Sequence, residues 1–208
     1  MNQKSDKPVL LFDLGGVIMD IEKERCIESL RKLGMEHPEE FLGDYGQKGP
    51  FLQLEKGEIT PAEFRDTLRP CLRPGVTDAE IDSAFCDFLI GIPVSRLRQL
   101  EDLHRTHRIY MLSNTNKIMW DSKIADEFRK DDHDRDYYFD GCVASFAVKS
   151  YKPDEKIFRE VLDRYGLRPD EVIFFDDSKE NCDAAAKLGL RTVWVTPGKE
   201  FYDLIPQD

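Results

Sequence analysis

The sequence predicts an α/β protein: a doubly wound parallel sheet with a small all-helical block inserted after the first strand. The apolar run 9–12 shows no alternation of polar and apolar residues, which is typical of a strand buried on both faces of a parallel sheet. From residue 93 onward, strand-like and helical patterns alternate, as they do where crossover helices join parallel strands. Between about 20 and 92, in contrast, the apolar spacing is helical and no strand pattern is found.

The first strand ends abruptly at a carboxylate, Asp13, which is followed by Leu14, Gly15 and Gly16. A charge at the carboxyl end of a buried parallel strand lies where open α/β sheets bind ligands. The two glycines allow a ligand to approach the main chain closely. A plainer interpretation is that Asp13 only opens a turn, because this residue pattern is also common turn chemistry.

The inserted block contains clear helix starts. Thr60–Glu63 and Thr77–Glu80 have the residues of capping boxes, in which the side chains of the first and last residue satisfy free backbone amides. We expect this block, residues 20–92, to form a helical cap domain over the carboxyl ends of the strands. Residues 1–19 and 93–208 would form the core domain.

Polar side chains also follow the later strands. These strands are expected at 109–112, 142–146, 172–175 and 192–195. Ser113 and Asn114 follow the first of them, Lys152 comes after the second, and the pair Asp176-Asp177 ends the third. Because the carboxyl ends of parallel strands meet at one edge of a sheet, we expect these residues to meet Asp13 there.

The composition excludes several classes of partner. With 41 acidic and 30 basic residues the formal net charge is −11, which repels nucleic acid and anionic membranes. No apolar run approaches the length of a membrane span. The five cysteines are widely spaced, so neither a zinc site nor a disulfide framework is indicated, and we expect a cytoplasmic protein. A monomer or weak homodimer is expected.

The expected cluster of Asp13, Asp176 and Asp177 would be costly without a counter-charge, because like charges in a partly dry pocket repel each other. A hard divalent cation such as Mg²⁺ resolves this, and it commonly uses carboxylates, water and substrate phosphate as ligands. Asp13 can also attack phosphorus as a nucleophile. The sequence therefore indicates a metal-assisted phosphoryl-transfer site.

A bound phosphoryl group would need donors as well. Lys152 can neutralise its oxygens, while Ser113 and the backbone amide of Asn114 can hydrogen-bond them as charge develops. The glycine loop, in particular Gly16, can offer backbone groups near the phosphate. The predicted substrate is a small phosphorylated molecule.

The motifs FDLGGV (12–17), LSNTN (112–116), KPD (152–154) and IFFDDSKEN (173–181) together resemble the haloacid dehalogenase-like hydrolases. With GEIT (57–60), the chain is similar to the branch that contains sugar-1-phosphate phosphatases and the amino-terminal domain of soluble epoxide hydrolase. The resemblance implies a Rossmann-like core and an Mg²⁺-dependent phosphatase acting on a sugar phosphate through an aspartyl-phosphate. It implies Asp13 as nucleophile and metal ligand, the Gly15 carbonyl and Asp177 as further ligands, and Asp176 close to the metal.

One position departs from the family pattern. The family usually carries a second aspartate two residues after the nucleophile, as general acid, and here that position is Gly15. A substrate with a good leaving group, such as an anomeric phosphate, would need no acid, or Asp20 or a water would supply the proton. Two alternatives stay open: a phosphate-binding or regulatory protein with little turnover, and a metal-free dehalogenase, which the pair Asp176-Asp177 disfavours.

Substrate selection is expected in the cap. The loop 46–50 carries polar and flexible residues that could cover a sugar, and His37 or Asn116 could add contacts. An equally simple interpretation leaves His37 and Lys48 in solvent.

Overall fold

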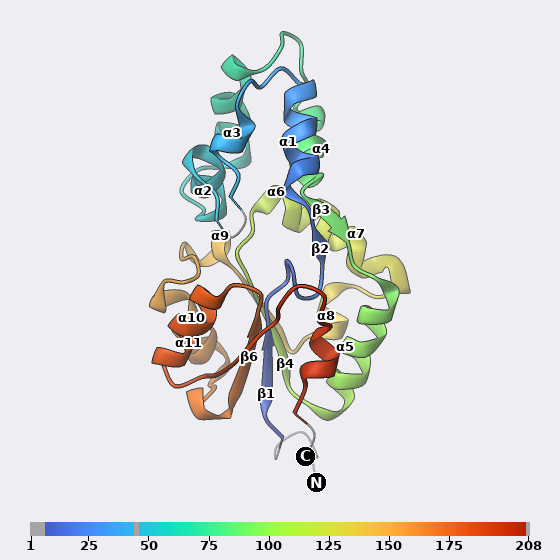
Figure 1. Ribbon diagram of the computed structural model, residues 1–208, viewed down its shortest axis with the longest axis vertical. Helices are drawn as coiled ribbons and strands as arrows, with labels where there is room; N and C mark the ends of the chain where they lie inside the picture. Colours follow the sequence, from blue (N-terminus) through green and yellow to red (C-terminus); the bar gives the residue numbers. More distant parts are fainter. Residues whose placement is uncertain (1–6, 44–45, 207–208) are drawn as a thin grey trace.

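The computed structural model describes residues 7–43 and 46–206, and within them a five-stranded sheet forms the centre of the molecule (Figure 1). Its strand order is β5-β4-β1-β6-β7, and every neighbouring pair is parallel. The bounds are β1 Val9–Phe12, β4 Ile109–Ser113, β5 Gly141–Ala144, β6 Val172–Asp176 and β7 Arg191–Trp194. The predicted doubly wound parallel sheet is confirmed.

Helices cover both faces of this sheet, which explains why β1 is apolar at every position. Successive side chains of a strand point to opposite faces. Leu10 and Phe12 pack into one apolar cluster with α5 (Val94–Thr106). Val9 and Leu11 pack into the other with α10 and α11. These two helices span Glu155–Tyr165 and Lys179–Lys187.

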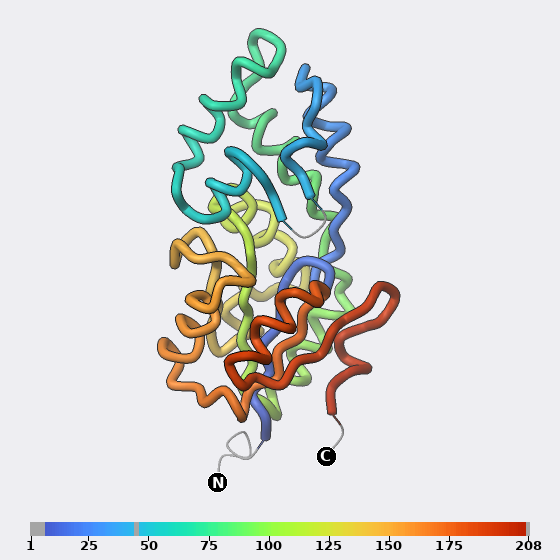
Figure 2. Tube along the Cα trace, turned by 60° about the vertical axis from the view of Figure 1, so that its left-hand side comes forward, coloured from blue at the N-terminus to red at the C-terminus, as the bar shows by residue number. Residues whose placement is uncertain are grey.

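Four helices stand together beyond the carboxyl ends of the strands, in the part of the chain expected to form the cap (Figures 1 and 2). They are α1 (Lys23–Lys32), α2 (Gly49–Glu55), α3 (Pro61–Leu68) and α4 (Asp78–Cys86). Both expected capping boxes are present, at the starts of α3 and α4. Phe51, Phe64 and Phe85 pack against one another with ring centroids 5.0–5.2 Å apart, so these aromatic side chains form the centre of the helical group.

The prediction of no strand between about 20 and 92 was wrong. β2 (Asp20–Ile21) and β3 (Leu89–Gly91) form a short antiparallel ribbon where the chain leaves and re-enters the α/β part. Strands of two and three residues are too short to show a period of two in the sequence. Their pairing partners lie about 70 residues apart, so tertiary contact rather than local pattern forms them.

Short helical segments complete the architecture. They are α6 (Lys117–Met119), a π-helical turn (Trp120–Ile124), α7 (Ala125–Phe128), α8 (Arg135–Tyr138) and α9 (Ser145–Val148). Single 3₁₀ turns are found at Pro38–Glu40, Arg69–Cys71, Arg129–Asp131, Pro169–Glu171 and Phe201–Leu204. Within the described residues, no helix combines the length and apolar character that crossing a membrane requires.

Candidate active site

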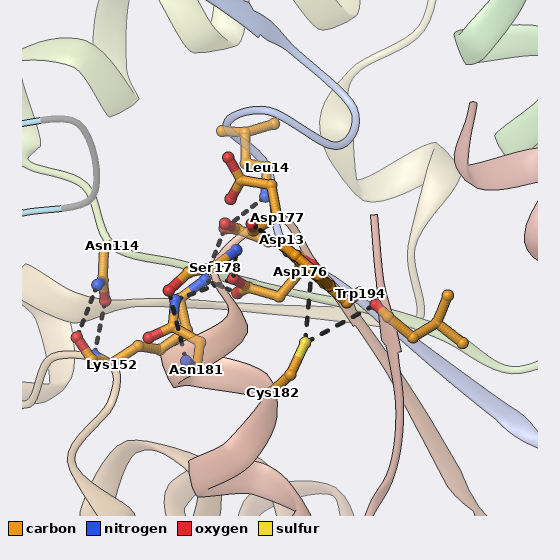
Figure 3. A network of polar contacts seen from close by, with 11 residues as sticks. Asp13, Leu14, Asn114, Lys152, Asp176, Asp177, Ser178, Asn181, Cys182 and Trp194 are labelled. Atoms are coloured by element: carbon orange, nitrogen blue, oxygen red, sulfur yellow. Dashed lines mark hydrogen bonds and ion pairs between the residues drawn. The ribbon is translucent and has the colours of Figure 1, made fainter. Parts of the chain in front are cut away.

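The polar ends of the strands meet in one cavity at the carboxyl edge of the sheet. Its lining includes Asp13 after β1, Ser113 and Asn114 at the end of β4, Lys152 before α10, and Asp177 after β6. Figure 3 shows most of these side chains directed toward one another from different elements. The structure thus brings together the residues that the sequence singled out, although they are up to 164 positions apart.

A buried lysine lies between two carboxylates at the floor of this cavity. Lys152 Nζ is 2.7 Å from Asp13 Oδ1 and 2.7 Å from Asp176 Oδ2. Its side chain is 1% exposed, so the charge depends on these partners. The Leu14 amide also donates to Asp13 Oδ1, at 2.7 Å. Because both donors meet the same oxygen, the second oxygen, Oδ2, faces neither of them.

Three carboxylates form the one cluster of potential metal ligands within the described residues. Asp13, Asp176 and Asp177 each place an oxygen within 4.8 Å of the others. Burial raises the pKa of Asp13, and the neighbouring aspartates raise it further against the opposing charge of Lys152. Burial and Asp176 likewise raise the pKa of Asp177. The part of each pKa shift that comes from the neighbouring negative charges would be relieved by an added cation.

The adjacent residues Asp176 and Asp177 have different surroundings. Asp176 Oδ1 accepts from the Ser178 amide at 2.8 Å and from Asn181 Nδ2 at 2.9 Å, while Oδ2 accepts from Lys152. Both oxygens of Asp176 are therefore held by protein donors, and its side chain does not line the cavity. Asp177 does line it. The indole of Trp194 fixes the Asp177 backbone by donating to its carbonyl at 2.9 Å.

Gly16 has a steric role in this arrangement. Its φ is 72°, in the left-handed region, and a Cβ atom at this position would collide with Asp177 Oδ2. Its amide donates to the Met19 carbonyl at 2.9 Å, so that amide is already bonded, and the expectation that Gly16 offers backbone groups near the phosphate stays a prediction. In the structure, Gly16 leaves room for the Asp177 carboxylate. Gly15 lines the cavity, and so does the nearby side chain of Ile21.

Asn114 holds the backbone of Lys152 with its side chain. Its Nδ2 donates to the Lys152 carbonyl at 3.0 Å, and its Oδ1 accepts from the Lys152 amide at 2.8 Å. The side-chain amide is thus committed to the main chain around the cis Lys152–Pro153 bond. Besides Lys152, the groups in the cavity that can still bind phosphate are the backbone amide of Asn114 and the hydroxyl of Ser113.

Comparison with known proteins places the chain in a family. The family model for haloacid dehalogenase-like hydrolases matches residues 8–189. The chain belongs to the haloacid dehalogenase-like hydrolases. The resemblance seen in its motifs is confirmed, and the protein is an enzyme of the hydrolase class.

Two phosphatases and one solved structure are similar to this chain over most of their length. D-Ribitol-5-phosphate phosphatase of Bacteroides thetaiotaomicron is 29% identical over 192 residues, which are 92% of this chain and 93% of that protein. Phosphorylated carbohydrates phosphatase of Thermotoga maritima is 25% identical over 190 residues, 89% and 83% of the two chains. A crystal structure of a haloacid dehalogenase family enzyme from B. thetaiotaomicron, in complex with magnesium and inorganic phosphate, superposes with a TM-score of 0.89. That enzyme is 39% identical, and the match covers 96% of this chain and 100% of that one.

Four polar residues suggested by the sequence lie away from the cavity of this hydrolase. Asp20, the expected substitute acid, accepts from Arg96 Nη1 at 2.7 Å and is not part of the cavity wall. His37 pairs with a neighbouring glutamate at 3.5 Å, with 66% of its side chain exposed. Asn116 is buried and caps α6 through its side chain. Exposed Lys48 does not line the cavity either. The sequence could not show where the side chains of Asp20, His37 and Asn116 lie, because each is bound by a partner in the folded chain.

Two cavity residues, Glu55 and Tyr151, were missed by the sequence interpretation, whereas Gln47 belongs to the loop 46–50 that was expected to cover the substrate. Gln47 and Glu55 reach the cavity from the helical group, and Tyr151 comes from the segment before Lys152. Glu55 could have been found, because it shares a helical face with two buried apolar residues, Phe51 and Leu54, at the spacing i, i+3, i+4. An acidic residue on the apolar face of a helix is unusual and indicates a buried role.

Proposed function

We propose that this hydrolase is an Mg²⁺-dependent phosphatase that acts on a small sugar or polyol phosphate through an aspartyl-phosphate at Asp13. The observation that carries the proposal is the buried ammonium of Lys152, held 2.7 Å from the candidate nucleophile Asp13, with Asp177 facing the same cavity. Positive charge for a phosphoryl group and carboxylates for a cation are thus side by side. The phosphatase relatives, and the related enzyme solved with magnesium and phosphate, support the same conclusion.

The donor set fits a hard divalent cation. All candidate ligands are oxygens: one carboxylate oxygen of Asp13, the Gly15 carbonyl and the Asp177 carboxylate, which are the ligand types that Mg²⁺ prefers. Because Asp176 is saturated by three donors, we place it behind the ligands, where it fixes Lys152 and the start of α11. Bound Mg²⁺ would supply charge neutralisation for the phosphoryl oxygens.

The residues of the chain define the steps. Lys152 holds Asp13 Oδ1, so the opposite oxygen can attack phosphorus while the bond to the leaving oxygen breaks. Lys152, the Ser113 hydroxyl and the Asn114 amide then stabilise the negative charge of the transferring group. A water hydrolyses the aspartyl-phosphate and regenerates the Asp13 carboxylate. Asp13 therefore both receives and releases the phosphoryl group.

The cavity wall supports a hydroxylated substrate. Gln47 Oε1 is buried, and no described residue donates a hydrogen bond to it. Gln47 lines the cavity on the side of the helical group, where the non-phosphate part of a substrate would lie. A sugar or polyol hydroxyl would donate to this oxygen and remove the penalty of leaving it unpaired.

The test is phosphate release from an aryl phosphate, a hexose 1-phosphate, a hexose 6-phosphate and a pentitol 5-phosphate, each with Mg²⁺ and with chelator. We expect Mg²⁺-dependent release that Asp13→Asn lowers by at least about 10³-fold. Asp170→Asn, with 77% of the side chain exposed, is the matched control and should retain full activity. Binding of phosphate without release from any substrate would reject the proposal in favour of a phosphate-binding protein. Halide release from a 2-haloacid without metal would reject it in favour of a dehalogenase.

A further inference from the structure

One carboxyl group of the cavity has no place in the chemistry described so far. Asp13 and Asp177 belong to the carboxylate cluster, and Lys152 is paired with two carboxylates. Glu55, the last residue of α2, lines the same cavity and is 6% exposed. Its hydrogen-bond partner is the side chain of Tyr151, and no ion pair within the described residues involves it. Glu55 is therefore a buried carboxyl group in the same cavity as the candidate nucleophile, hydrogen-bonded to Tyr151 but not ion-paired.

The environment of Glu55 keeps it protonated near neutral pH. Burial raises its pKa to about 8, and the hydrogen bond with Tyr151 opposes this only in part. Burial also raises the pKa of Tyr151, so the phenol keeps its proton. A general acid works best when its pKa lies close to the operating pH, and Glu55 meets this condition.

The position of Glu55 matches the leaving side of the reaction. In phosphoryl transfer the attacking and leaving oxygens lie roughly in line on opposite sides of phosphorus. Asp13 attacks from the end of β1, so the leaving oxygen points away from the sheet and toward α2, which stands on that side (Figure 1). We infer that Glu55 donates a proton to the leaving oxygen of the substrate, an inference that rests on the proposed phosphatase function.

A buried serine fixes the backbone of Glu55 relative to Thr115, in the loop that follows β4. The Ser145 hydroxyl lies 2.6 Å from the Glu55 carbonyl and 2.8 Å from the Thr115 carbonyl, and it accepts from the Thr115 amide at 2.9 Å. Just beyond α2, a Cβ atom at Gly57 would collide with the Phe146 carbonyl, so the helix end packs directly on α9. The acid is thus positioned against the loop that follows β4.

The proton can be followed through both steps. When the bond between Asp13 and phosphorus forms, the bond from phosphorus to the leaving oxygen breaks, and that oxygen takes the proton of Glu55. The product leaves as a neutral alcohol, and Glu55 becomes a carboxylate. It then accepts a proton from the water that attacks the aspartyl-phosphate. Phosphate is released, and both Asp13 and Glu55 return to their starting states.

The test compares Glu55→Gln with the wild type on three substrates in the presence of Mg²⁺. Glutamine keeps the size of the side chain and can still form a hydrogen bond, but it cannot transfer a proton. 4-Nitrophenyl phosphate has a good leaving group, propyl phosphate has a poor one without hydroxyls, and a pentitol 5-phosphate has a poor one with hydroxyls. We expect kcat to fall about 10²-fold or more on the two alkyl substrates and less than about threefold on the aryl substrate. Glu58→Gln, an exposed residue three positions further on, is the matched control and should not change any rate.

The other outcomes overturn the inference. A loss restricted to the pentitol 5-phosphate and expressed in KM would make Glu55 a hydroxyl-binding residue. An equal loss on all three substrates would make it a structural residue. Equal retention on all three would show that no acid acts at this position. If the wild type hydrolyses none of the three, the proposed function fails first, and this result is distinct from selective loss in the variant.

Discussion

Glu55→Gln should change how the stability of the protein depends on pH, whether or not Glu55 takes part in catalysis. Burial raises the pKa of Glu55 to about 8 in the folded protein, against an ordinary value of 4.5. Between these two pH values the folded chain holds a proton that the unfolded chain has lost. The folded state binds more protons there, so the free energy of unfolding falls as pH rises.

The magnitude follows from the size of the shift. Each unit of difference in pKa corresponds to about 1.4 kcal/mol, so the full shift amounts to about 5 kcal/mol. This loss of stability is absent below about pH 4.5, grows through neutral pH and is complete above about pH 8. Glutamine is neutral at every pH and lacks it. The variant should therefore gain stability relative to the wild type as the pH increases.

Urea unfolding at pH 5, 6.5 and 8.5, with chelator present, measures this difference directly. We expect the gap between Glu55→Gln and the wild type to widen by several kcal/mol from the lowest to the highest pH. The exposed control Glu58→Gln should follow the wild type at all three values. Parallel curves for Glu55→Gln and the wild type would show that the Glu55 carboxyl ionises freely. The argument from burial would then be refuted.

Three further predictions test the cavity. Lys152→Met should lower the free energy of unfolding by about 3–5 kcal/mol in chelator, with partial recovery in Mg²⁺, because it leaves buried carboxylates unpaired; an unchanged urea midpoint would contradict this. Asp177→Asn should weaken Mg²⁺ binding, measured by calorimetry, about tenfold more than Asp176→Asn, and the reverse order would exchange their roles. At Gly15 an added Cβ atom would meet only side-chain atoms, at ordinary contact distance. Gly15→Asp, added to Glu55→Gln, should therefore raise the turnover of propyl phosphate about tenfold above that of Glu55→Gln alone. No increase would mean that an acid at position 15 cannot replace Glu55.

The sheet could be predicted because the residues within each strand show whether that strand is buried. The four residues of β1 and the first four of β6 are all apolar, and such a run is typical of a strand covered on both faces. The polar groups Asp13 and Asp176-Asp177 come directly at or after these runs. Since parallel strands share one carboxyl edge, their convergence could be predicted without knowledge of the connections. The capping boxes of α3 and α4 could also be predicted, because each is formed by two residues only three positions apart.

What the sequence could not give depends on contacts between distant segments. The different surroundings of Asp176 and Asp177 follow from Asn181 and Lys152, which bind only the first of them. The space beside Gly16 is required by Asp177, a residue 161 positions away. Asp20 looked available in the sequence, but it is bound by Arg96 on the first turn of α5. None of these relations leaves a periodic pattern in the chain.

The charges of the cavity connect the metal, the phosphate and the protonated glutamate. The three clustered carboxylates and Lys152 carry a formal charge of −2, which would repel a phosphate group and which one divalent cation cancels. An ionised Glu55 would add another negative charge to the same cavity and weaken substrate binding again. The burial that raises the pKa of Glu55 therefore has two effects at once: it keeps the cavity neutral while substrate enters, and it retains a proton for the leaving oxygen. In a chain with a net charge of −11, both effects favour a phosphorylated substrate.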